Sequence, residues 1–262
     1  MTEYEIFKNC FPQLAINENA FLKLAFSEDT KCFHDTGAFA CCDGGRLTLL
    51  CVAPKQRGKG IGSELLKKCE DYAKSLGKEK LSIGGGIITG AAEGSSEFFA
   101  KRGYTLGGSF CEMELPLDGF TVPNAELPQN VNFRFFDGDI EVIRAAVGEV
   151  DDEWVQYFNE GGRFFCCYAD GDELASFCII DEDVRCALSD GNSKIGSIGC
   201  VGTVPKFRRM GLGLHMVALG AQWLKKQGCD KVFIHYTHLD KWYGKLGAKV
   251  FLRFTSAEKE LL

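Results

Sequence analysis

Two short basic, glycine-rich stretches of the sequence have residue types that could bind phosphate. They run from Arg57 to Gly62 and from Arg208 to Gly213, and both contain the pattern Arg-x-x-Gly-x-Gly. Each follows an apolar, β-prone run that breaks at a proline and precedes apolar residues at helical spacing, which indicates a strand, a loop and a helix. Glycines let backbone N–H groups approach a ligand at the helix N-terminus, where the helix dipole adds partial positive charge. Both stretches are therefore predicted to bind an anion.

The repetition of this pattern about 150 residues apart predicts two domains of one kind. A chain of 262 residues is long enough for two domains that each bury a core. Residues 116–130 hold three of the six prolines and show little periodic pattern, which is typical of a domain boundary. We therefore expect a first domain at residues 1–118, a linker at 119–130 and a second domain at 131–262.

Both stretches resemble the acyl-CoA-binding motif of the GNAT superfamily of N-acetyltransferases, in which a Val-x-Pro-x-x-Arg-Gly-x-Gly-x-Gly run ends the fourth strand and opens a helix. Pro54 and Pro205 also stand at the place of the family's proline. Residues 98–104 and 242–248 follow at the expected distance and resemble the family's late helix and the strand after it. The resemblance implies an α/β fold with a mixed sheet (α+β), arranged as tandem GNAT-like acyl-CoA N-acyltransferase domains.

The same resemblance implies acetyl-CoA as cosubstrate, with its pyrophosphate on the loop amides and its pantetheine arm along the open edge of the preceding strand. The residues that this assigns to the cofactor in the second half are Gly202, Thr203, Val204, Arg208, Arg209, Met210, Gly211, Leu212 and Gly213. Those in the first half are Cys51, Val52, Arg57, Gly58, Lys59, Gly60, Ile61 and Gly62. A solvated basic turn is the alternative for Arg208 and Arg209, and the strand positions also suit a purely structural role.

In the family that the chain resembles, an amine attacks the thioester directly, so an enzyme must deprotonate the amine and protonate the departing thiolate. Tyr243 stands where the late helix of that family usually provides the acid. The matching residue of the first half is Phe99, which has no proton to donate. This contrast assigns the chemistry to the second half and leaves the first half as a cofactor-binding or structural copy.

The general base stays open at this stage. His235 and His238 flank the predicted mouth of the site, and histidine is the side chain best suited to exchange protons near neutral pH. Glu173 and Asp181 lie on the predicted third strand of the second half, which is another usual place for such a base. The acidic run at 149–153 could attract a cationic amine, although a solvated face is the simpler reading.

Composition limits the classes of partner and compartment. The formal net charge of −6 argues against nucleic acid or an anionic membrane as the main partner, because both require extended basic surface. The cysteines number thirteen and include no Cys-x-x-Cys pair, which favours reduced, buried thiols over a disulfide framework or a zinc site. The acidic N-terminus does not resemble a signal peptide, and no apolar run approaches the roughly 20 residues of a membrane span. We expect a soluble, cytoplasmic protein without a metal.

Three classes of function are compatible with these observations. The favoured one is an N-acetyltransferase that moves an acetyl group from acetyl-CoA to a primary amine of a small molecule or peptide. A noncatalytic acyl-CoA-binding module or sensor would keep both loops without turnover. A dinucleotide site is disfavoured, because Met216 stands where that motif requires Gly or Ala. The sequence identifies neither the acceptor amine nor the oligomeric state.

The two halves differ at the edges of their expected sheets. The first half has no strand before its opening helices and is expected to close with short strands at 104–106 and 110–115. The second half has no clear seventh strand after the strand expected at 249–254. Because unpaired sheet edges promote association between chains, we expect one half to supply or shield the edge of the other.

Overall fold

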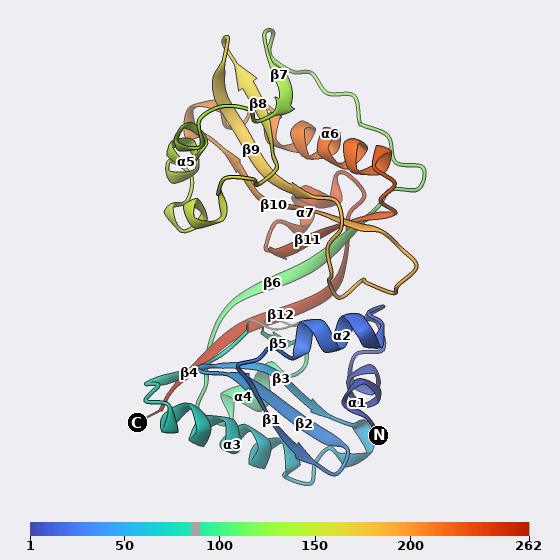
Figure 1. The fold of residues 1–262 in the computed structure, drawn as a ribbon, viewed down its shortest axis with the longest axis vertical. Helices are drawn as coiled ribbons and strands as arrows, with labels where there is room; N and C mark the ends of the chain where they lie inside the picture. Colours follow the sequence, from blue (N-terminus) through green and yellow to red (C-terminus); the bar gives the residue numbers. More distant parts are fainter. Residues whose placement is uncertain (85–89, 262) are drawn as a thin grey trace.

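The computed structural model describes residues 1–84 and 90–261. They form two lobes stacked along the long axis of the molecule, with the first half below the second in Figure 1. The elements of the first half are α1 (Glu3–Cys10), α2 (Glu18–Ala25), β1 (Thr30–Asp35), β2 (Ala38–Asp43), β3 (Arg46–Val52), the 3₁₀ turn η1 (Pro54–Gln56), α3 (Ile61–Ser75), β4 (Lys80–Ile83), β5 (Ala91–Ala92), α4 (Ser96–Ala100) and β6 (Thr105–Pro116).

The second half repeats much of this order. Its elements are β7 (Asn132–Phe135), α5 (Ile140–Gly148), the 3₁₀ turn η2 (Asp152–Tyr157), β8 (Phe164–Ala169), β9 (Glu173–Asp181), β10 (Ile195–Thr203), the 3₁₀ turn η3 (Pro205–Phe207), α6 (Leu212–Lys226), β11 (Lys231–Thr237), α7 (Asp240–Gly244) and β12 (Lys249–Glu260). The mixed α/β architecture is the one that the sequence predicts.

Among the described residues, the strands form one 12-stranded sheet with the order β1-β2-β3-β4-β12-β6-β11-β10-β9-β8-β7, and β5 pairs with β12 beside this path. The long strands β6 and β12 pair antiparallel where the two lobes meet (Figure 1). At one end, residues 257–260 of β12 pair with β4 of the first half. At the other end, residues 111–116 of β6 pair with β11 of the second half. Each half therefore contributes a strand to the sheet of the other.

This exchange confirms the expectation that one half covers the sheet edge of the other. The expected strand boundaries are wrong in two places. The first half closes with the single strand β6 instead of two short strands, and β12 continues to Glu260 instead of ending near residue 254. The reason is the same in both cases, because the additional residues pair with strands of the other half or with each other across the two halves.

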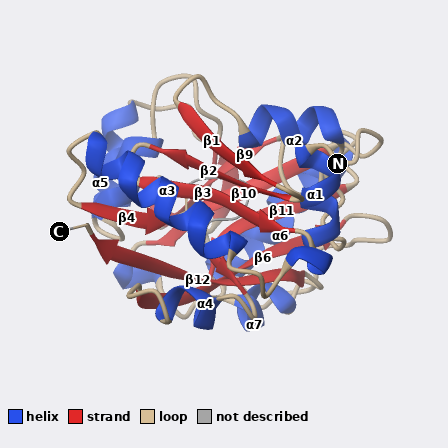
Figure 2. Ribbon diagram, turned by 90° about the horizontal axis from the view of Figure 1, so that it is seen from below, coloured by secondary structure: helices blue, strands red, loops and turns tan. Residues whose placement is uncertain are grey.

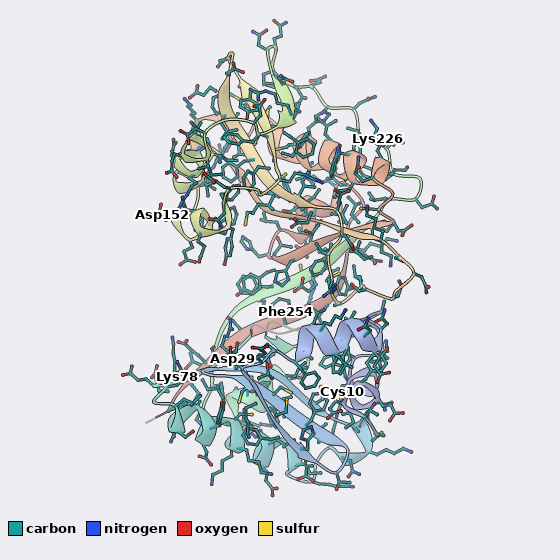
Figure 3. All side chains as sticks on the ribbon, viewed as in Figure 1. Cys10, Asp29, Lys78, Asp152, Lys226 and Phe254 are labelled. Carbon is teal, nitrogen blue, oxygen red and sulfur yellow. The ribbon has the colours of Figure 1, made fainter. Side chains whose placement is uncertain are left out.

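Apolar side chains pack on both faces of the sheet in the first half. One cluster lies under α1 and α2 and includes Phe7, Phe21 and Phe39, whereas a second cluster lies under α3. Figure 2, which views the molecule from the first-half end, shows α3 lying across the strands of this lobe. Phe254 comes from β12, the last strand of the chain, yet it belongs to the cluster under α1 and α2 and is 1% exposed (Figure 3). A side chain of the second half thus completes the core of the first.

A second contact between the lobes comes from the long β9–β10 connection. The backbone N–H groups of Ile16 and Asn17, at the start of α2, donate to the carbonyl oxygens of Ala187 and Ser189 at 3.1 and 2.8 Å. The connection therefore holds the second half against the α1–α2 face of the first. Within residues 1–84 and 90–261, none of the helices has the length and apolar character needed to cross a bilayer.

The strand exchange predicts that neither half folds alone. Residues 1–118 without the second half leave β6 unpaired on both edges and β4 unpaired on one, and residues 131–262 without β6 leave one edge of β11 unpaired. We expect each fragment, expressed separately, to be insoluble or aggregated, and co-expression of the two to restore a soluble 1:1 complex measured by size-exclusion chromatography. Two fragments that are each soluble, folded and monomeric would contradict this.

Candidate functional site

Each glycine-rich loop leads into a helix whose first N–H groups are uncapped by a side chain. α3 begins after Gly60 and α6 begins after Gly211, and both glycines have left-handed backbone, with φ of 86° and 77°. Glycine adopts this conformation without penalty and has no side chain to accept from the N–H groups of the first turn. These N–H groups, together with the helix dipole, favour an anion at both helix N-termini.

The arginine of each loop fixes the loop to the preceding strand. The Nε atom of Arg57 donates to the carbonyl oxygen of Val52 at 3.0 Å, and the Nε atom of Arg208 donates to that of Thr203 at the same distance. These arginines are predicted from the sequence to contact phosphate. Their Nε atoms hold the loop in place, so the terminal Nη atoms are the ones that could reach a ligand.

The second loop carries backbone strain that the first loop avoids. Arg209 has φ of 67°, and the residue at the matching place in the first half is Gly58, with φ of 78°. Left-handed backbone costs a residue with a Cβ atom about 1 kcal/mol. The glycine pattern alone does not reveal this, because Arg209 reads simply as another basic residue.

The strands that lead into the loops diverge from their neighbours in the second half. β10 pairs in parallel with β11 through residues 195–197 and 231–233. Within the described part of the chain, no further pair joins these strands, so the last residues of β10 present an open edge toward β11. The pairing of β10 with β9 also shifts between Gly199 and Gly202, and Cys200 within this bulge has φ of 47°. A flat ligand arm could lie along such an edge.

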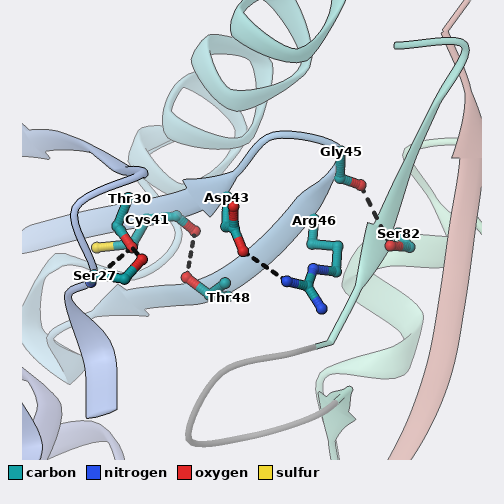
Figure 4. Close-up of polar contacts among 8 residues, drawn as sticks. All are labelled: Ser27, Thr30, Cys41, Asp43, Gly45, Arg46, Thr48 and Ser82. Atoms are coloured by element: carbon teal, nitrogen blue, oxygen red, sulfur yellow. Dashed lines mark hydrogen bonds and ion pairs between the residues drawn. The ribbon is translucent and has the colours of Figure 1, made fainter. Parts of the chain in front are cut away.

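A smaller irregularity occupies the matching place in the first half. The pairing of β3 with β2 shifts at Thr48, whose hydroxyl donates to the carbonyl oxygen of Cys41 at 3.1 Å (Figure 4). Thr48 is 7% exposed, so its side chain fills this position. The corresponding residue of the second half is Gly199, where an added Cβ atom would meet no other atom within 4 Å. The space beside the bulge is thus filled in the first half and open in the second.

A cavity of about 800 Å³ lies at the loop of the first half. Its lining includes Cys10, Val52, Gly62, Ser95, Arg102 and Arg253. At the second loop, by contrast, Leu212 is 1% exposed, and a Cβ atom added to Gly213 would lie 2.9 Å from the Thr203 hydroxyl and 3.6 Å from Trp242. The chemistry is predicted to lie in the second half, whereas this cavity lies in the first.

Arg102 gives the first half a cation that the second half lacks at the matching position. Its Nε and Nη2 atoms donate to the hydroxyl of Ser63 in the first turn of α3, at 3.0 and 2.6 Å. Its guanidinium also lies over the Phe98 ring, 3.6 Å from the centroid. The corresponding residue of the second half is Leu246. Arg102 was missed from the sequence, although aligning the two halves places it opposite Leu246.

Tyr243 lies in α7 and is 5% exposed. Burial raises its pKa, and the nearby thiols of Cys178 and Cys200 raise it further, so the hydroxyl keeps its proton at neutral pH. Cys200 belongs to the bulge of β10, so the Tyr243 side chain lies within electrostatic reach of that bulge and of Cys178 in the core. Phe99, the matching residue, is buried in the first half at 6% exposure.

The candidate bases differ sharply in their surroundings. Glu173 forms an ion pair with Lys206, and Asp181 is exposed at the end of β9. His238 is exposed as well, whereas the Nδ1 atom of His235 lies 2.9 Å from the Oε2 atom of Glu112, a residue of β6. Glu112 was missed from the sequence, because Cys111, Met113 and Leu115 form the apolar face of this strand and Glu112 alternates with them.

Metal ligands do not gather at either loop. In residues 1–84 and 90–261, no group of three or more His, Cys, Asp or Glu side chains has the arrangement needed to hold a metal ion. Part of the acidic run of the second half has a structural role, because Asp151 caps η2 by accepting from the Glu153 N–H at 3.0 Å. Asp151 nevertheless lies close enough to Cys200 to raise the pKa of that thiol.

The paired loops, the diverging strands and the late helices define the class of protein. The acetyltransferase (GNAT) family model matches residues 31–104 and 134–248, one segment in each half. The chain therefore belongs to the GNAT family of acetyltransferases, in a tandem arrangement.

Individual relatives extend this likeness over most of the chain. The chain is similar to a mycothiol acetyltransferase of Renibacterium salmoninarum, with 25% identity over 208 residues that cover 71% of this chain and 58% of that protein. It also resembles the solved structure of a tandem GNAT protein from the clavulanic acid biosynthesis pathway, with a TM-score of 0.62, 14% identity and coverage of 100% and 96% of the two chains.

A further solved structure is that of a glucosamine N-acetyltransferase region in a fungal β-N-acetylglucosaminidase. Its TM-score is 0.69 at 17% identity, over 92% of this chain and 34% of that one. At such identities, the structural likeness shows the fold alone.

Cys10 is predicted to be the most reactive thiol of the chain. It lies at the end of α1 on the cavity wall (Figure 3) and donates to the Val52 carbonyl at 3.4 Å. A hydrogen bond with Cys51, and then the Arg57 side chain, outweigh burial and lower its pKa to about 7. At pH 7.5 we expect iodoacetamide to label Cys10 first, more slowly below pH 7 as the thiolate is protonated, and acetyl-CoA to protect it.

Cys200 is the matched comparison, because it is also half-buried but burial raises its pKa to about 11. Peptide mapping after partial labelling measures both rates in one sample. Equal labelling of Cys10 and Cys200 would show that the environment of Cys10 does not activate it.

Proposed function

We propose that the protein is an acetyl-CoA-dependent N-acetyltransferase that transfers acetyl to a primary amine by direct attack, and that its second half performs the transfer. The observation that carries this proposal is Tyr243, a buried phenol on α7 within electrostatic reach of Cys200 in the bulge of β10; the thioester would lie along the open strand edge beside this bulge. An acid at this point stabilises the thiolate as the C–S bond breaks and does little for the bound thioester beforehand. It therefore acts on the transition state, as catalysis requires.

The first half is proposed to hold a CoA molecule without turning it over. Support comes from the cavity of about 800 Å³ at its loop and from Arg102, which adds a cation beside the N-terminus of α3. Phe99 offers no proton at the place of Tyr243. A cavity at the loop without a phenol at Phe99 also favours the second candidate function, in which this half is an acyl-CoA-binding module or sensor.

The boundaries 1–118, 119–130 and 131–262 remain our proposal for the domains, and β6 and β12 each pair with strands of the other half within one sheet. A reducing compartment such as the cytoplasm would suit thirteen cysteines. The acceptor is proposed to be a small-molecule or peptide amine. Thiol release from acetyl-CoA, measured with a panel that includes glucosamine, amino acids, polyamines and a lysine peptide, separates the enzyme from the binding module.

Acetyl-CoA is predicted to bind both loops with micromolar affinity, and one substitution in each loop separates the two sites. In Gly211→Glu and Gly60→Glu, the carboxylate lies where the pyrophosphate would sit and the new Cβ atom strains the left-handed backbone. We expect each variant to lose one of two binding events in calorimetry. Two unchanged binding events in either variant would contradict the assignment of that loop.

Tyr243→Phe is predicted to lower turnover at least tenfold with little change in acetyl-CoA affinity, because positioned acids contribute about 100-fold to 10,000-fold. The reciprocal Phe99→Tyr should have almost no effect on turnover. Steady-state kinetics of thiol release measure both. Full activity in Tyr243→Phe, combined with loss of turnover on disrupting residues 57–62, would instead assign the chemistry to the first half.

A further inference from the structure

A buried carboxylate of the first half contacts an exposed histidine of the second. Glu112 on β6 is 1% exposed, whereas the His235 side chain on β11 is 51% exposed. The two carboxylate oxygens lie 2.8 and 2.9 Å from the Nδ1 atom of His235, and Oε2 also accepts from the backbone N–H of Tyr236 at 3.4 Å. Tyr236 has left-handed backbone, with φ of 51°.

This contact determines where the imidazole carries its proton. A carboxylate removed from water needs a hydrogen-bond donor, so the Nδ1–H group of His235 donates to Glu112. A neutral imidazole with its proton on Nδ1 has its lone pair on Nε2. Because the side chain is half-exposed, Nε2 is the ring nitrogen that can meet a substrate.

The strand register places His235 at the opening between β10 and β11. Ser197 and Phe233 form the last pair of these strands, and Gly199 and His235 follow two residues later on the two diverging arms. A Cβ atom added to Gly196 would meet Leu224 of α6, and one added to Gly220 of α6 would meet Ile198. Residues 196 and 198 therefore face α6, and Gly199 faces away from that helix.

His235 faces the same side as Gly199. Its ring stacks on that of Phe233, with centroids 5.6 Å apart, whereas Val232 and Ile234 point into the core under α6. An added Cβ atom at Gly199 meets nothing within 4 Å, so open space lies across the gap from the imidazole. Tyr243 on α7 lies within electrostatic reach of Cys200, in the bulge of β10. With a thioester in the gap, the imidazole is the candidate base and the phenol is the candidate acid.

The first half lacks this pair at the matching positions. Ser82 holds the position in the β3–β4 pair that Phe233 holds in the β10–β11 pair. Gly84, two residues after Ser82, therefore corresponds to His235, two residues after Phe233. On the neighbouring strand, Ala257 pairs with Ile83 in the same way that Met113 pairs with Ile234. The residue before Ala257 is Ser256, which therefore corresponds to Glu112, the residue before Met113. His235, Glu112 and Tyr243 thus occur together at the lobe of the second half, and the matching positions at the lobe of the first half are Gly84, Ser256 and Phe99.

We propose that His235 is the general base of the second half and that Glu112, supplied by the first half, is its positioning residue. This rests on the acetyl transfer proposed above. The amine nitrogen bonds to the carbonyl carbon, the C–S bond breaks with its electrons on sulfur, Nε2 accepts the proton that the nitrogen loses, and the Tyr243 hydroxyl donates one to the thiolate. The imidazolium and the phenolate then exchange a proton through solvent, which balances the reaction.

The first test reads the imidazole directly, without turnover. In the ¹⁵N–¹H spectrum of the full-length protein, His235 should show a protonated Nδ1 and an unprotonated Nε2. Glu112→Gln should disturb this tautomer, whereas the matched control Glu114→Gln should not, because Glu114 lies on the same strand and pairs with Lys231 at 3.2 Å. An Nε2–H tautomer in the unaltered protein, or an unchanged tautomer in Glu112→Gln, would overturn the positioning role.

The second test asks whether Nε2 faces the cofactor. Diethyl pyrocarbonate modifies unprotonated imidazole nitrogens, and peptide mapping reports each histidine separately. We expect acetyl-CoA to protect His235 at least fivefold and to leave His34, which pairs with Glu3 in the first half, unprotected. Equal rates at His235 with and without acetyl-CoA would overturn its place at the thioester.

The third test is kinetic and uses His235→Asn, whose amide N–H can still donate to Glu112 but which has no group at Nε2. We expect kcat of thiol release, with the most active amine of the panel, to fall about 100-fold to 10,000-fold, while KM for acetyl-CoA changes less than threefold. The kcat should fall at least tenfold in Glu112→Gln and should not change in Glu114→Gln. Undiminished turnover in His235→Asn overturns the base role alone, whereas an absence of turnover in the unaltered protein overturns acetyl transfer and the base role with it.

Discussion

The antiparallel pairing of β6 with β12 is the interaction on which the rest of the molecule depends. β12 lies between β4 and β6, and β6 lies between β12 and β11, so each strand is interior to the joined sheet. The backbone hydrogen bonds of both lobes are therefore satisfied only when both are present. Two side chains discussed above follow from this pairing: Phe254 fills the core of the first half, and Glu112 reaches a histidine of the second.

The two halves share a backbone plan but have diverged in the chemistry of their side chains. The first half has more to offer a phosphate, with Arg102 beside the N-terminus of α3 and an open cavity at its loop. The second half has Tyr243 beside its bulge and open space at Gly199. Binding strength and turnover require different things, since tight binding of a ground state does not lower a barrier. A chain with two copies of one motif can assign the two requirements to separate copies.

The sequence predicts the local features well and the long-range ones poorly. The duplicated loops, the tandem α/β fold and the place of Tyr243 follow from short motifs that carry their own signal. The burial of Glu112 does not, because its strand alternates in polarity as a solvated strand would, and its partner His235 is 123 residues away in sequence. The strain at Arg209 and the activation of Cys10 likewise depend on φ angles and on neighbours such as Cys51, 41 residues away in sequence, which no local pattern contains.

The place of β12 also sets the order in which the molecule can fold. Lys80 of β4 and Glu258 of β12 form an ion pair at 2.9 Å across a sequence separation of 178 residues. During synthesis, the first half leaves the ribosome long before the strand that fills its sheet. Contacts of such separation form slowly, and unpaired strands promote aggregation in the meantime. The lobe made first is therefore completed only after residues 257–260 have been made, which makes the nascent chain a natural client for chaperones.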